Sequence, residues 1–150
     1  MEIIPVQLLP FVLAAISGIL MAVQGSLNAS LSKIVGLWEA TFVVHLTGTL
    51  LLLVALFFVR IGKGDLSSLG QAPWYAYLGG VAGVFIIYLV AASIPAVGVA
   101  NATTAIIVGQ VLTAVLIDHV GGFGLERIPC GWNQLAGLLL LAIGAKLLLK

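Results

Sequence analysis

The sequence predicts an all-α membrane protein built as a bundle of five transmembrane helices. Of its 150 residues, 62% are hydrophobic and only 7% are charged, whereas about 25% of residues are charged in an average soluble domain. Apolar runs recur along the chain, each close to the roughly 20 residues that cross a hydrocarbon core as a helix. They cover residues 8–28, 38–60, 73–93, 97–118 and 131–149. Because only short connections remain, residues 1–150 are predicted to form a single transmembrane domain.

The first two spans have distinct ends. Span 8–28 is apolar until it reaches Gln24 and Asn28. With Glu2 in place of a basic region before it, and with a run too long for a signal sequence, we expect this span to be retained. Span 38–60 opens with Trp38 and Glu39, where an interfacial aromatic side chain and a carboxylate suit a helix N-terminus.

The last three spans are delimited by proline, glycine and polar residues. Span 73–93 begins at a proline, and the link Ser93–Gly98 that follows has no charge. Irregular backbone at membrane depth is tolerated where protein or a cavity surrounds it, so Pro95 and Gly98 mark a candidate hinge. Span 97–118 ends at Asp118, just before a pair of glycines that stop a helix, and span 131–149 completes the chain.

Several kinds of site are excluded by what the sequence lacks. Cys130 is the only cysteine, and His45 and His119 are the only histidines, so we expect no disulfide within the chain and no metal site. No nucleotide-binding or hydrolase motif occurs. We therefore expect no enzyme activity, no cofactor and no nucleic-acid partner.

The positive charges do not favour either orientation in the membrane. Lysines and arginines near helix ends are retained on the cytoplasmic side, and five helices would place three on each side. One side collects Arg60, Lys63 and Arg127, and the other collects Lys33, Lys146 and Lys150. This balance predicts dual topology and an antiparallel homodimer with inverted symmetry. The alternative is that a small bias still fixes one orientation.

Small residues three or four apart predict close helix packing, since they let backbones approach in lipid. We expect packing roles for Gly18, Gly25, Gly79, Gly83, Gly98 and Gly109. A bundle of five helices has little interior of its own, so a second copy would complete it.

Polar side chains gather on the first and fourth spans. Ser17, Met21, Gln24 and Asn28 fall on one helical stripe, and the fourth span carries Asn101, Thr104 and Gln110. Polar groups at membrane depth either join helices or line a path for a solute. Both interpretations stay open for Gln24, Asn28 and Gln110.

Two ionisable residues are candidates for proton coupling. His45 lies on a short polar stripe of the second span, where it is either a neutral, hydrogen-bonded side chain or a proton carrier. Asp118 lies at a helix C-terminus, where the helix dipole disfavours an anion. It is either functional or paired with Arg127 or His119.

The chain resembles the YdcZ-type family of small bacterial inner-membrane proteins, which is placed in the drug/metabolite transporter superfamily. The residues that carry this resemblance are Val23-Gln-Gly-Ser-Leu-Asn28 with Leu31, Thr47-Gly-Thr49, Pro73-Trp74, Leu78-Gly-Gly80, Gly109-Gln110 and Ile117-Asp-His119 with Gly121. The resemblance implies a five-helix exporter of the cytoplasmic membrane and an antiparallel dimer. His45, the Glu126–Cys130 segment and Asn133 depart from the pattern. The related small multidrug-resistance transporters carry a glutamate in the first helix, where this chain has Gln24 at depth.

These expectations combine into a secondary transporter that moves a small organic metabolite or drug-like solute by alternating access. The predicted substrate-binding residues are Gln24, Asn28, Asn101, Thr104 and Gln110. Two alternatives remain: a passive pore, and a half-transporter that needs a second chain.

Overall fold

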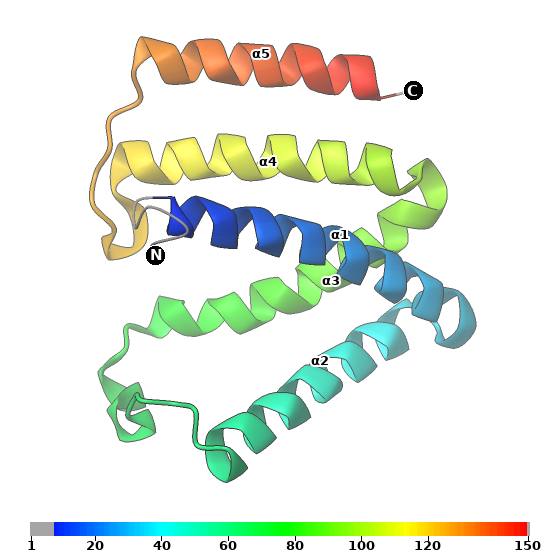
Figure 1. Cartoon of the computed structure of the whole chain (residues 1–150), viewed down its shortest axis with the longest axis vertical. Coiled ribbons are helices and arrows are strands. Elements are labelled where there is room, and N and C mark those ends of the chain that lie inside the picture. Colours follow the sequence, from blue (N-terminus) through cyan, green and yellow to red (C-terminus); the bar gives the residue numbers. More distant parts are fainter. Residues whose placement is uncertain (1–7, 150) are drawn as a thin grey trace, which may run out of the picture. The chain divides into compact units, whose positions relative to one another are not determined.

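The computed structural model describes residues 8–149, and these residues form helices without any β-strand (Figure 1). The main helices are α1 (Leu9–Val35), α2 (Leu37–Leu53), α3 (Leu78–Val97), α4 (Val99–Val120) and α5 (Trp132–Leu148). The chain divides into two compact units, one ending at Ala96 and one beginning at Val97. In the first unit α1 packs on α2, and in the second α4 packs on α5.

The first helix is longer than its predicted span 8–28, because α1 continues to Val35. The polar residues do not end it, since the hydroxyls of Ser26 and Ser32 donate to the carbonyls of Ala22 and Ala29 in their own helix. Such bonds satisfy the hydroxyl without breaking the backbone hydrogen bonds of the helix.

A single residue, Gly36, separates α1 from α2. Its φ of 100° is a left-handed conformation that glycine adopts without strain. The carboxylate of Glu39 occupies the space that a Cβ on Gly36 would need. Glu39 therefore lies over the N-terminus of α2, where an acidic side chain is favourable.

The second helix changes its winding before it ends. After Leu53 the chain forms a π-helical turn over Val54–Phe58, and Val59 N–H donates to the carbonyl of Val54. The loop that follows contains a short 3₁₀ helix, Leu66–Gln71, capped by the Asp65 side chain. A second 3₁₀ turn, Trp74–Tyr77, leads into α3, and Tyr77 Oη donates to Leu69 O at 2.6 Å.

The predicted irregular link Ser93–Gly98 is largely helical. The third span was expected to end at residue 93, but α3 passes through Pro95 and ends at Val97. Membrane helices tolerate proline where backbone groups are otherwise satisfied. Only Gly98, with φ 86°, interrupts the helical backbone between α3 and α4. A hinge at Pro95 and Gly98 stays a prediction.

In the second unit, the connection between α4 and α5 folds back onto the end of α4. Gly121 is the left-handed C-cap of α4, and a short 3₁₀ turn, Gly122–Gly124, follows it. Ile128 N–H then donates to Asp118 O at 2.7 Å. At the start of α5, the Gln134 side chain accepts from Gly131 N–H at 2.7 Å.

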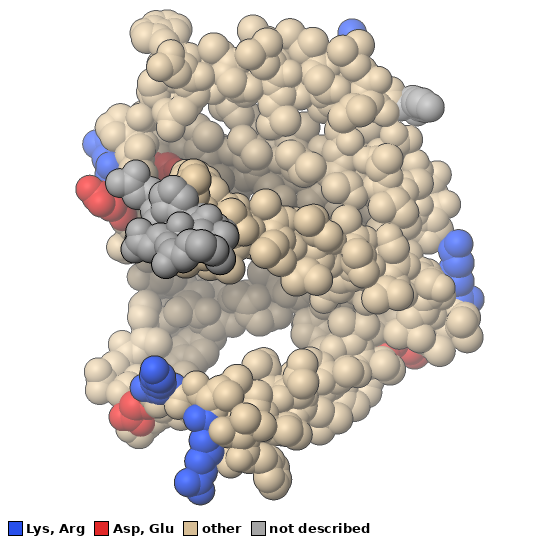
Figure 2. Space-filling model, in the orientation of Figure 1, with Lys and Arg blue, Asp and Glu red and all other residues tan. Residues whose placement is uncertain are grey.

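Length and composition make four helical segments able to cross a membrane, and α5, with 17 residues, is a shorter apolar helix. The four segments are Leu9–Val35, Leu37–Phe58, Trp74–Val97 and Val99–Val120. Figure 2 shows an uncharged surface over most of the visible face. Within α1 to α5, every charged residue lies within two residues of a helix end: Lys33, Glu39, Asp118 and Lys146. Glu2, used for the prediction that the first span is retained, and Lys150, used for the topology prediction, lie outside the described residues.

Among the described residues, the hydrophobic core consists only of alanines. They are Ala29, Ala40, Ala91, Ala102 and Ala145, and no large side chain is fully buried. The leucines, isoleucines and phenylalanines are exposed on the helix surfaces. This pattern suits helices surrounded by lipid or by further protein, because large apolar side chains there need no interior.

Candidate functional site

The buried residues of the first unit lie where α1, α2 and α3 meet. Gly25, Asn28 and Ala29 are buried on α1, Ala40 and Thr41 on α2, and Ala91 on α3. All except Asn28 and Thr41 are alanine or glycine, which let helices approach closely. The tightest approach is at Gly25, where a Cβ would come within 2.9 Å of Val90 Cγ1 and 3.1 Å of Ile94 Cδ1.

Asn28 is the polar residue of this junction that has no partner. The side chain of Asn28 is only 5% exposed, yet its amide makes no hydrogen bond within the described chain. Thr41 is buried too, but its hydroxyl donates to Leu37 O at 2.8 Å. Neither polar atom of Asn28 is sealed off completely. A buried amide without a partner costs about 1–3 kcal/mol, and both interpretations of Asn28, contact between helices and lining a path for a solute, stay predictions.

The predicted stripe on α1 divides into an exposed part and a buried part. Ser17, Met21 and Gln24 line an open groove of about 410 Å³ on α1, together with Leu20, Val23 and Leu27. Ser17 donates its hydroxyl to Ala14 O at 2.8 Å, which leaves the exposed Gln24 amide as the groove's available polar group. Asn28 lies one turn further along, inside the junction.

His45 connects α2 with α3. Its Nδ1 lies 2.9 Å from Thr41 O, and since a carbonyl accepts, Nδ1 carries the hydrogen. The other nitrogen, Nε2, faces α3, where a Cβ on Gly83 would lie 3.6 Å from it. A ring stack between Trp38 and Tyr88, with centroids 4.5 Å apart, joins the same two helices. His45 is thus hydrogen-bonded in this structure, and its role in proton carriage stays a prediction.

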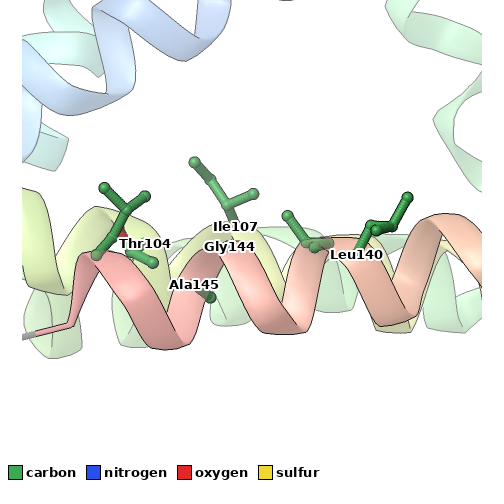
Figure 3. A pocket seen from close by; sticks show the side chains of 7 residues that line it. Thr104, Ile107, Leu140, Gly144 and Ala145 are labelled. Atoms are coloured by element: carbon green, nitrogen blue, oxygen red, sulfur yellow. The ribbon is translucent and has the colours of Figure 1, made fainter.

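In the second unit, Thr104 lines an apolar cavity of about 260 Å³ (Figure 3). The other lining residues are Ile107, Leu140, Leu141, Gly144, Ala145 and Leu148. Figure 3 shows that the labelled residues come from α4 and from α5. The cavity exists because Gly144 and Ala145 carry almost no side chain. Its α5 wall was not anticipated from the sequence, although the adjacent small residues of an otherwise leucine-rich helix were a usable signal.

The two amides predicted on α4 are placed differently. Asn101 donates from Nδ2 to Val97 O at 2.9 Å, so part of its hydrogen-bonding capacity is used at the start of the helix. Gln110 is exposed and does not line the Thr104 cavity. Substrate binding by Asn101, Thr104 and Gln110 stays a prediction.

Asp118 and its neighbours hold the loop between α4 and α5. The Asp118 carboxylate forms no ion pair with any described residue, and Arg127 instead donates from Nε to His119 O at 2.9 Å. The His119 ring accepts at Nδ1 from Cys130 N–H, 3.1 Å away. The expected pair of Asp118 with Arg127 or His119 is therefore absent here. Its half-buried carboxylate remains a proton-coupling candidate.

The predicted packing glycines differ in their surroundings. Gly25 has close neighbours and Gly83 faces His45, whereas a Cβ on Gly18, Gly79, Gly98 or Gly109 would meet no atom within 4 Å. For these four residues, packing stays a prediction that would need a partner surface outside the contacts described.

Comparison with protein-family models identifies the chain. Residues 9–147 match the model described as "Putative inner membrane exporter, YdcZ". The chain belongs to the YdcZ family. A search of the curated proteins and a search of the solved structures each found no match.

Membership of the YdcZ family confirms the resemblance inferred from the sequence motifs. The match includes both the Gln24–Asn28 region on α1 and the Asp118–Gly121 region at the end of α4. An exporter of the inner membrane is a transporter, which is not an enzyme class, and the apolar helices agree with a multi-pass protein of that membrane. Substrate and mechanism are not part of the family description.

Proposed function

We propose that this YdcZ-family protein is a secondary transporter that exports a small organic solute by alternating access, working as an antiparallel homodimer. The observation that carries the proposal is the Asn28 amide, which is 5% exposed and makes no hydrogen bond to any described residue. An unsatisfied amide inside a membrane protein is costly, so its presence there favours a binding function. Gln24, one turn away in an open groove, extends the polar surface.

The solute class follows from the chemistry of these groups. Amides donate and accept hydrogen bonds but carry no charge, and within α1 to α5 all charged side chains lie near the helix ends. A permanent ion would find no counter-charge at mid-membrane, where an unpaired charge is expensive. A polar neutral or weakly charged organic solute is therefore the favoured substrate.

The proposed second copy would complete the walls of the transport path. Between residues 8 and 149, one chain buries only alanines in its hydrophobic core, and a path across a membrane needs protein on all sides wherever polar groups line it. The balanced lysines and arginines of the sequence support insertion in both orientations, and hence an antiparallel pair.

Reconstituted protein can test this function. Purified protein is screened by thermal shift against neutral and weakly charged metabolites, and the strongest stabiliser is used in radiolabelled form with liposomes. We expect saturable uptake and counterflow. Asn28→Ala and Gln24→Ala are each expected to lower the flux about tenfold, the effect of losing about 1.4 kcal/mol of binding. Ser26→Ala is the matched control, because that hydroxyl is already bonded to Ala22 O.

The alternative functions give different results. Flux that rises linearly with concentration and shows no counterflow would indicate a passive pore. Flux that appears only after a second, different chain is added would indicate a half-transporter. Full transport by both alanine variants, with the dimer intact, would remove Asn28 and Gln24 from the binding site.

A further inference from the structure

The open groove on α1 is symmetric about the middle of its helix. Ala22 is the central residue of α1, which runs from Leu9 to Val35. The six lining residues form three pairs, each with one member as far before Ala22 as the other lies after it. The pairs are Ser17 with Leu27, Leu20 with Gln24, and Met21 with Val23. When the helix is inverted about its midpoint, the two members of each pair therefore exchange levels along the helix axis, and the groove covers the same levels as before.

The only available polar group in this groove lies near the middle of α1. At a rise of about 1.5 Å per residue, Gln24 is about 3 Å from the helix midpoint. The exposed Gln24 amide has no hydrogen bond within the described chain. Lipid tails cannot supply one, and an unsatisfied polar group in hydrocarbon costs several kcal/mol. The face that carries Gln24 therefore requires a polar partner, which excludes lipid as its permanent neighbour.

The side chains of the groove favour an antiparallel second copy. In an antiparallel pair centred on Ala22, the small Ser17 of one copy meets the large Leu27 of the other. In a parallel pair, Leu27 would meet Leu27 and Ser17 would meet Ser17, so the side-chain volume between the helices would be large at one end and small at the other. Cores pack best where large side chains face small ones.

The Gln24 amide also suits a two-fold relationship. An amide both donates and accepts, so two copies of the same amide can bond to each other reciprocally, which two lysines or two carboxylates cannot. Inversion about Ala22 places the two Gln24 residues on opposite sides of the centre, each level with Leu20 of the other copy, so they lie about 6 Å apart along the axis, in helices that pack about 8–10 Å apart. Two glutamine side chains can span that separation.

We propose that the α1 groove faces the same groove of an antiparallel second copy, with the two Gln24 amides paired at mid-membrane. This inference rests on the proposed homodimeric transporter and assigns its central contact. In the empty dimer the amides bond to each other. A solute with its own donor and acceptor replaces those bonds, so the binding site is incomplete without the second copy.

Cysteine cross-linking tests the arrangement. In a Cys130→Ser background, Ser17→Cys and Leu27→Cys chains with different tags are expressed separately and together, and membranes are treated with a short bis-maleimide. We expect a cross-linked dimer only on co-expression, between residue 17 of one copy and residue 27 of the other. Cross-links in either chain expressed alone would indicate a parallel contact and overturn the proposal.

The contribution of Gln24 is measured separately, as the dimer dissociation constant in detergent. Gln24→Leu is expected to raise this constant about tenfold, the effect of two interhelical hydrogen bonds of about 0.6 kcal/mol each. Gln110→Leu makes the same change at an exposed amide outside the groove, and we expect no effect on dimerisation. An unchanged dissociation constant for Gln24→Leu would overturn the amide pairing.

The α1 contact and the proposed transport function would be overturned by different results. A stable dimer that transports solute but forms no cross-link between residues 17 and 27 would overturn this contact and leave the proposed function standing. A protein that is monomeric and moves no solute would overturn the proposed function itself.

Discussion

Gly25 on α1 lies so close to Val90 on α3 that a Cβ on the glycine would come within 2.9 Å of the valine Cγ1. Real Cβ atoms do not approach other carbons this closely, so the contact can form only with glycine at this position. The neighbouring residues Asn28 and Ala29 are buried on the same helix. The close approach of α1 to α3 thus lies within one helical turn of the buried Asn28.

Gly25→Ala is expected to destabilise the protein by about 1–3 kcal/mol, the usual cost of overpacking an interior. Val90 and Ile94 would have to move, and α1 would separate from α3. Equilibrium unfolding in mixed detergent measures the change. Adding Val90→Ala to Gly25→Ala should recover part of the loss, because it removes the closest atom. Gly48→Ala is the control, since a Cβ there meets nothing within 4 Å, and an equal loss in that variant would contradict the explanation.

The sequence predicted the helices well and their ends less well. Apolar runs of about 20 residues are a strong signal because the membrane sets their length. The ends of α1 and α3 were missed because polar residues, in α1, and proline, in α3, were taken as breaks. In the structure the Ser26 and Ser32 hydroxyls bond within α1, and α3 continues through Pro95. Polar content and proline alone therefore do not fix where a membrane helix stops.

Asp65 should make the loop between α2 and α3 sensitive to acid. The Ser67 hydroxyl and backbone N–H both donate to its carboxylate, which lowers the pKa of Asp65 below the ordinary 3.8. A carboxyl whose pKa is lower in the folded chain contributes stability above its ordinary pKa. That contribution is lost as the pH falls below 3.8 and through the lowered value.

Carboxyl carbon NMR measures the titration directly. Ser67→Ala should raise the pKa of Asp65 towards 3.8, since it removes the hydroxyl donor that causes the largest part of the shift. Asp65→Asn should abolish the acid-induced loosening of the Leu66–Gln71 helix, followed by hydrogen exchange. A pKa of Asp65 that stays the same in Ser67→Ala would show that the hydroxyl is not the cause.

His119→Phe is expected to loosen the connection between α4 and α5. Phenylalanine keeps a ring but removes the Nδ1 acceptor that receives Cys130 N–H at 3.1 Å. One hydrogen bond contributes about 0.5–1.5 kcal/mol net, so the open form of the loop should become about 2- to 12-fold more populated. Cys130, the only thiol and half-buried, reports this opening as a proportionally faster reaction with N-ethylmaleimide at fixed pH.

His45→Phe is the control for that measurement, because it removes the other histidine, which bonds to Thr41 O on α2. Its Cys130 alkylation rate should match that of the unaltered protein. If His119→Phe also left the rate unchanged, the ring of His119 would not be what holds the loop.

Only part of the candidate site could be predicted from the sequence, and the reason is physical. Helical periodicity correctly put Ser17, Met21 and Gln24 together, because residues three and four apart share a helix face. Periodicity does not show how closely a neighbouring helix approaches each residue. It therefore could not distinguish the exposed Gln24 from the buried Asn28. It also could not anticipate that Asn101 donates to Val97 O.

Adjacent residues on α5 should respond in opposite ways to added volume. Ala145 is 7% exposed, in a segment where α5 packs on α4, whereas a Cβ on the neighbouring Gly144 would meet no atom within 4 Å. Ala145→Leu therefore forces the two helices apart, and we expect a loss of about 1–3 kcal/mol in the free energy of unfolding. Gly144→Ala adds a methyl group to the open cavity and replaces a poor helix former, so stability should be retained or rise by up to about 1 kcal/mol. Unfolding in mixed detergent compares the two variants. Equal losses in both would mean that the cavity beside Thr104 is closed in the membrane, because only a filled space would reject a single methyl group at Gly144.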